Sequence, residues 1–157
     1  MVYRRWFAND NNKTLVLIQF QEYPSLMRCR DLDDRQAAAI LYLRIAPVAE
    51  QVDVSICVLL SHGSNGYPAG LLASCLGRWE DAERHFEHAL AVNERLGARP
   101  YLVRTRHAYA QMLLDRNAPR DRERAAELIA AGLAEAEQLG MARERVRFQR
   151  LRTRVPT

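Results

Sequence analysis

Two histidines three residues apart are the first residues in this sequence whose spacing suggests chemistry. His85 and His88 stand beside Glu83 and Glu87, and two side chains at this spacing on a helix can approach one metal ion. A protein zinc site needs at least three ligands, and no third one lies at a suitable distance along the chain. We therefore predict no metal site, and we expect both histidines on the surface of the protein.

The other potentially reactive side chains fit no catalytic signature. His62 and His107 have no neighbouring serine, cysteine or aspartate in a nucleophile pattern. Gly63, Gly66 and Gly70 are spaced like a glycine-rich loop, but the Gly-Lys-Ser/Thr sequence that binds phosphate is missing. The sequence thus predicts a protein that is not an enzyme, with no catalytic residue and no cofactor.

The cysteines and the apolar stretches indicate a cytoplasmic location. Cys29, Cys57 and Cys75 are odd in number and widely spaced, and no secretory signal is recognisable before them. This pattern is typical of a reducing compartment, and Cys75 is expected as a small core residue. The apolar stretches Leu15–Phe20 and Val52–Leu60 are much shorter than the ~20 residues that cross a bilayer, so we predict no membrane span.

Length and composition are those of one soluble globular domain. A chain of 157 residues can bury roughly 68–70% of its unfolded surface, and 48% hydrophobic with 27% charged residues is typical of a globular protein. Lys13 is the only lysine among 23 basic residues, and 19 acidic residues leave a net charge of +4. One domain must therefore supply the elements that position any functional side chain.

Helical periodicity dominates the second half of the chain. It predicts one helix from Arg78 to about Leu96, one from Tyr101 to Leu114 and one from about Arg122 to Leu139. Each of three predicted helix ends has a glycine after an apolar residue, where glycine can adopt the left-handed cap conformation; these are Gly77, Gly97 and Gly140. The pattern predicts consecutive helices joined by tight turns.

One spacing of small, bulky and moderate residues occurs three times, at intervals of 44 and 43 residues. An interval of this length corresponds to one helix pair and a loop. Three such units would cover most of the chain. The repeated positions are Ala38, Tyr42 and Ile45, then Ala82, Phe86 and Ala89, and finally Ala125, Ile129 and Gly132.

The stretch from Gly70 to Leu90, which reads GLLASCLGRWEDAERHFEHAL, resembles a tetratricopeptide repeat. The resemblance implies that Gly70 and Ala82 lie where two helices meet closely, while Phe86 wedges between helix pairs. Residues 96–100 (LGARP) and 121–125 (DRERA) extend the likeness to the C-terminal repeats of large bacterial regulators, which join an ATPase to a nucleotide cyclase or a LuxR-type DNA-binding domain. The implied fold is all-α, an α–α superhelix of about three helix pairs.

The resemblance divides the chain into three parts. Residues 1–13 match no part of the repeat pattern, residues 14–140 are expected to hold the repeats, and residues 141–157 form a basic capping helix or tail. The first repeat helix is expected near residues 14–29, although it contains Pro24, and the second is interrupted at residues 63–68. A helix should therefore begin close to Pro68 or be kinked there.

Stacked helix pairs form a concave surface that receives a peptide or a neighbouring domain, so we expect a protein-protein interaction or scaffolding module. The resemblance implies the sensory or regulatory region of a bacterial signalling or transcriptional regulator. Helix phase places four residues on the expected inner face, and these are Tyr67, Arg104, His107 and Gln111.

Two alternatives remain open at the level of the sequence. Residues 143–154 contain six arginines against one glutamate, and with the arginines between residues 99 and 124 they suggest a nucleic-acid-binding accessory protein. Val146, Phe148 and Leu151 favour a capping helix over the last repeat instead. The second alternative is a truncated remnant of a larger regulator with no independent function.

Overall fold

Six α-helices account for most of residues 35–50, 52–55 and 60–155, the part of the chain that the computed structural model describes. Helix α3 (Arg35–Ile45) leads through a short 3-10 helix (Ala46–Val48) into two strands, β1 (Val52–Ser55) and β2 (Leu60–Ser64). Five helices follow, and these are α4 (Gly66–Cys75), α5 (Trp79–Arg95), α6 (Arg99–Arg116), α7 (Asp121–Gln138) and α8 (Ala142–Arg152). This mostly helical structure confirms the predicted class, apart from the two strands.

The helix boundaries of α5, α6 and α7 agree with the sequence prediction to within two residues. Gly77, Gly97 and Gly140 have φ angles of 72°, 61° and 66°, the left-handed region that glycine occupies without strain. Pro68 lies in the first turn of α4, where its missing N–H costs no intrahelical hydrogen bond. The helix expected to begin near Pro68 thus begins two residues earlier, at Gly66.

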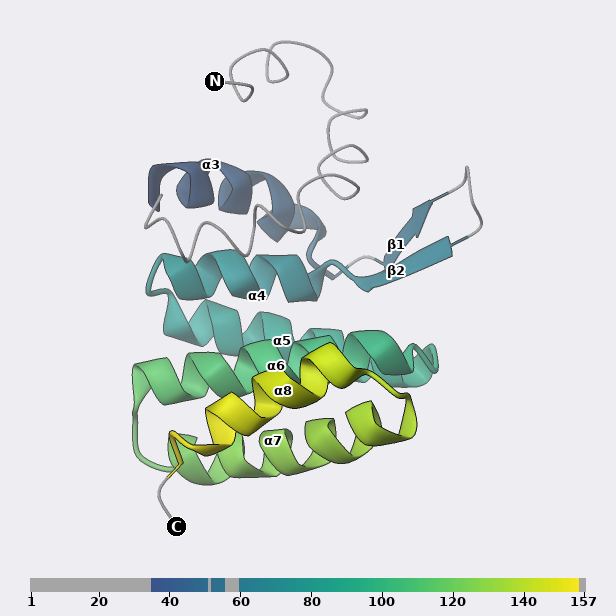
Figure 1. Ribbon diagram of the computed structural model, residues 1–157. Helices are drawn as coiled ribbons and strands as arrows, with labels where there is room; N and C mark the ends of the chain where they lie inside the picture. Colours follow the sequence, from purple (N-terminus) through teal and green to yellow (C-terminus); the bar gives the residue numbers. More distant parts are fainter. Residues whose placement is uncertain (1–34, 51, 56–59, 156–157) are drawn as a thin grey trace.

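The helices pack in their order along the chain (Figure 1). Each helix contacts the next one, from α3 against α4 to α7 against α8. In addition, α4 contacts α6, and α6 contacts α8. These three alternate helices therefore form a row, and the two strands project sideways from the array after α3 (Figure 1).

Glycines let the helices approach closely at two places. A Cβ atom added to Gly70 of α4 would lie 2.7 Å from the ring of Phe86 in α5, and one added to Gly132 of α7 would lie even closer to the ring of Phe148 in α8. Both rings are fully buried. The nine repeated positions predicted from the sequence are also buried, and they lie in α3, α5 and α7.

The hairpin of β1 and β2 departs from the all-helical expectation. Its strands are antiparallel, with a bulge between Asp53 and Val54. The sequence carries a strand signal here, because Val52 and Val54 are β-branched and alternate with polar residues. The N–H of Ser64 donates a 3.1 Å hydrogen bond to Oδ1 of the buried Asn93, which fixes the end of β2 against α5.

Several predicted features lie outside the described residues, and these are the segment 1–13, the helix expected at 14–29, Cys29 and Cys57. Cys75 is half-buried and packs against the core. Among the residues that the structure does describe, none of the helices combines the length and the apolar character that a membrane crossing requires.

The prediction that both His85 and His88 lie on the surface is wrong for His85. Only 7% of His85 is exposed, and its Nε2 atom lies 3.1 Å from Oη of Tyr42 in α3, within hydrogen-bond distance. Helix phase explains the error, because His85 and the buried Ala89 are four residues apart and share one face of α5. His88 is half-buried, with Nε2 3.2 Å from the backbone oxygen of Glu50.

We expect the buried His85 to make the protein less stable in mildly acid solution. Burial lowers the pKa of His85 below its ordinary value, and the charge of Arg84 acts in the same direction. Below about pH 6.5 the unfolded chain binds a proton at this histidine that the folded protein excludes, so the free energy of unfolding falls as the pH falls. Urea titrations at several values between about pH 7.5 and about pH 5 measure this change. The free energy of unfolding should fall less in His85→Gln than in the wild type.

The matched control is His88→Gln, which removes a histidine from the same helix and leaves the contact between His85 and Tyr42 in place. Its pH dependence should follow that of the wild type more closely. Identical pH profiles for the wild type and His85→Gln would rule out His85 as the cause.

Candidate binding site

A depression on the row of α4, α6 and α8 brings together side chains from several helices. Its volume is about 120 Å³. Three residues of α4, the first residue of α5, five residues of α6 and one arginine of α8 contribute to it. The lining residues are Leu71, Ser74, Cys75, Trp79, His107, Ala108, Gln111, Met112, Asp115 and Arg147.

The depression has an apolar floor and a polar edge. Leu71 and Trp79 are half-buried and pack against the hydrophobic core, to which the buried Met112 belongs. Gln111 and Asp115 supply polar groups at the edge, and both retain exposed surface. A concave apolar surface with a few polar groups around it is the usual form of a binding site.

Two of the four residues predicted for the inner face, His107 and Gln111, line this depression. Arg104 lies one turn before His107 on α6, with its guanidinium carbon 5.7 Å from the ring centre of Tyr101. Tyr67, the fourth, is close enough to Arg104 for the positive charge of that arginine to lower the pKa of its hydroxyl, against the larger effect of burial. The structure thus brings the four predicted residues to one side of α4 and α6.

Tyr67 and His107 are largely buried, however, with exposed fractions of 4% and 8%. The ring of His107 packs edge-on against Phe148 of α8, with 5.3 Å between ring centres. Burial raises the pKa of the Tyr67 hydroxyl, while nearby Arg147 and Arg104 oppose the rise. His107 therefore forms part of the wall of the depression, whereas Tyr67 does not line it, and both offer little contact area to a ligand.

Sequence reasoning missed Leu71, Trp79 and Arg147. These three residues lie on different helices, and the phase of one helix carries no information about which neighbour it will face. A signal for Arg147 does exist, because arginines recur around it at steps of three and four residues and so mark one face of α8.

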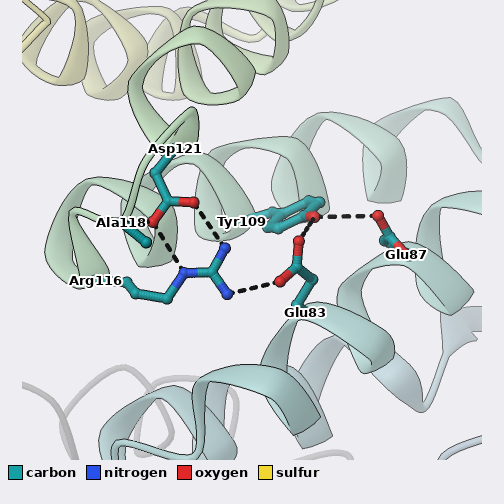
Figure 2. Close-up of polar contacts among 6 residues, drawn as sticks. All are labelled: Glu83, Glu87, Tyr109, Arg116, Ala118 and Asp121. Atoms are coloured by element: carbon teal, nitrogen blue, oxygen red, sulfur yellow. Dashed lines mark hydrogen bonds and ion pairs between the residues drawn. The ribbon is translucent and has the colours of Figure 1, made fainter.

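A second polar cluster joins α5, α6 and the start of α7 (Figure 2). Arg116 donates hydrogen bonds of 2.9 and 2.7 Å to Asp121 and one of 2.6 Å to Glu83. The Oη atom of Tyr109 lies 3.1 Å from Glu83 and 3.2 Å from Glu87. The hydrogen bonds from Arg116 lower the pKa of Asp121. Because each of these side chains already has a hydrogen-bond partner within the cluster, we interpret it as part of the scaffold.

Several of the arginines between residues 99 and 124, considered above for nucleic-acid binding, are paired with acidic side chains. Arg99 and Arg106 both bind Glu135, the latter at 2.8 Å, and Arg124 binds Glu127 at 2.9 Å. Their positive charge is balanced locally, which reduces its attraction for a phosphate backbone. The surface formed by residues 99–124 therefore carries less unbalanced positive charge than its arginine content suggests.

A metal site and a second depression are weaker candidates for a functional site. Within residues 35–50, 52–55 and 60–155, no three His, Cys, Asp or Glu side chains are grouped so that they could hold a metal ion. A larger depression of about 470 Å³ lies at the turns before α5 and after α6. Three of its four charged side chains are already paired, Arg78 with Asp81 at 2.6 Å and Arg116 with Glu83 and Asp121.

Comparisons with known proteins give no relative from which a function could be transferred: no family model, no curated protein and no solved structure matches the chain. The shape and the chemistry of the depression are the remaining guide to function.

Proposed function

We propose that this chain is a protein-protein interaction module, in which the depression between α4, α6 and α8 receives a side chain from a segment of a partner protein. The observation that carries the proposal is the combination of an apolar floor, formed by residues such as Leu71 and Trp79, with polar groups at the edge. Interfaces between proteins commonly use one apolar anchor in such a pocket, surrounded by polar contacts.

We also propose that the helices form a tetratricopeptide-like superhelix, with α4 paired to α5, α6 paired to α7, and α3 and α8 as the outer helices. The contacts of α4 with α6 and of α6 with α8 support this arrangement, as do the buried positions Ala82 and Phe86. Alternate helices of such an array line one continuous surface that binds partners. In a bacterial regulator, this surface would receive a neighbouring domain or another protein.

The proposal is tested by selecting ligands and then filling the depression. Random peptides of about 12 residues, displayed on phage, are selected on the purified chain, and the Kd of the best ones is measured by fluorescence anisotropy. Gln111→Trp should weaken binding at least about 10-fold, because the indole occupies the space that the anchor needs.

Gln149→Trp provides the matched control, because Gln149 is exposed on α8 and does not line the depression. Its Kd should stay within about twofold of the wild type, and both variants should keep the helical circular dichroism spectrum. Equal binding to Gln111→Trp and wild type, or a selection that enriches no peptide, would contradict the proposal.

A further inference from the structure

Four arginines near the C-terminal end of the chain lie on α8 and on the turn that follows it. Arg143, Arg147, Arg150 and Arg154 follow one another at steps of four, three and four residues, and these steps place the three that belong to α8 on one side of the helix. We call these four residues the arginine stripe. Phe148 and Leu151 hold the adjoining side of α8 in the core, so the stripe runs along its flank.

Two contacts show that the stripe faces the depression. Arg147 is one of the lining residues. Arg154, in the turn after α8, pairs at 2.8 Å with Asp115 of α6, which also lines the depression. Arg147 and Arg154 therefore place the stripe at one edge of the candidate binding site.

Two arginines of the stripe carry positive charge that no carboxylate among the described residues pairs with. Arg143 and Arg150 are exposed, and neither forms an ion pair with any residue in the described part of the chain. Arg104, on the α6 side of the depression, likewise has an aromatic ring as its neighbour and no carboxylate among those residues. Arginines on other helices do have carboxylate partners. Glu135, for example, binds both Arg99 and Arg106.

From this charge distribution we propose that the partner segment is an acidic peptide with one large apolar side chain. The apolar side chain enters the depression beside Leu71 and Trp79, and aspartate or glutamate residues on the same segment lie along Arg143 and Arg150. This inference rests on the proposed function and specifies the chemistry of its ligand. Charged pairs at the rim of an interface chiefly set the partner choice, the association rate and the salt dependence.

A peptide fits the site better than a nucleic acid does. The depression, at about 120 Å³, has the size of a single side chain. Proteins that bind single strands present exposed aromatic faces on which bases stack, whereas Trp79 is half-buried in the floor.

The test begins with the sequences of the selected phage peptides, which should be enriched in aspartate and glutamate and contain one large apolar residue. Fluorescein-labelled copies of the best peptide are then titrated with the charge-reversal variant Arg143→Glu/Arg150→Glu. We expect a loss of affinity of at least about 10-fold, and a weaker dependence of Kd on salt than in the wild type.

The matched control is Arg145→Glu/Arg152→Glu, which makes the same change of net charge on exposed residues of α8 outside the stripe. Its affinity for the peptide should stay within about threefold of the wild type. Both double variants change the net charge equally, but only Arg143→Glu/Arg150→Glu alters residues that contact the peptide. A peptide with lysine in place of its acidic residues should bind Arg143→Glu/Arg150→Glu better than it binds the wild type.

The outcomes separate this inference from the proposed function. If the selected peptides are blocked by Gln111→Trp but carry no excess of acidic residues and bind both double variants equally, the acidic ligand is wrong and the interaction module stands. If no peptide is selected, both fail. If a single-stranded DNA of about 12 nucleotides binds, and binding depends on Arg143 and Arg150 but not on Gln111, the stripe serves nucleic acid and the inference is overturned.

Discussion

Phe86→Ala is expected to lower the free energy of unfolding by about 3–5 kcal/mol, measured by urea denaturation with circular dichroism. Phe86 has no exposed surface, and its ring stacks on Tyr109 with 5.6 Å between ring centres while it covers Gly70. The change leaves a cavity where α4, α5 and α6 meet, and packed backbones can close such a cavity only in part. Val146→Ala, at an exposed apolar residue of α8, should stay within about 0.5 kcal/mol of the wild type.

Gly70→Ala should destabilise the wild-type protein but stabilise the Phe86→Ala variant. In the wild type, the new Cβ would lie 2.7 Å from the enclosed ring of Phe86, so we expect a loss of about 1–3 kcal/mol. In Phe86→Ala the space is vacant, and alanine is favoured over glycine inside a helix by up to about 1 kcal/mol. Additive effects of the two substitutions would show that Gly70 and Phe86 are not in direct contact.

Arg116→Met should cost about 3 kcal/mol, the second large effect. The substitution leaves the carboxylate of Asp121, whose side chain is 5% exposed, with the N–H of Ala118 at 2.7 Å as its remaining hydrogen-bond donor among the contacts described. Glu83 loses its cationic partner at the same time. Removing one member of a buried ion pair is expensive because the other charge stays buried without compensation. The measurement is again the free energy of unfolding.

Two variants separate the buried charge from the loss of side-chain volume. Adding Asp121→Asn to Arg116→Met removes the unpaired charge and should restore part of the stability; no recovery would assign the cost to packing. Arg84→Met tests an exposed ion pair instead, because Arg84 is 67% exposed and its partner Asp81 keeps Arg78. It should change the stability by no more than about 0.5 kcal/mol.

The helices and their ends could be predicted from the sequence because the signals are local. Ala82, Phe86 and Ala89 recur at helical spacing, and Gly77 and Gly97 mark left-handed caps whatever the rest of the chain does. The hairpin was harder, because a strand of four or five residues has a weak periodic signal next to long helices.

The binding site could be predicted only in part, because it is assembled from residues distant in sequence. Gln111 follows from the phase of α6, but the apolar floor requires Leu71 and Trp79 to meet α6 in space. His85 shows the same limit, since its polar character suggested the surface while Tyr42, 43 residues earlier in the chain, supplies its buried partner. Pairings of this kind depend on tertiary contacts that no local pattern encodes.

The order in which the helices pack has a consequence for how the chain folds. Most substantial contacts join elements one or two positions apart, and the turns after α4, α5, α6 and α7 contain three or four residues each. Closing such short loops costs little entropy, and topologies rich in local contacts fold in microseconds to milliseconds. Because each helix pair can form before distant parts of the chain meet, folding can start at several places and spread from neighbour to neighbour.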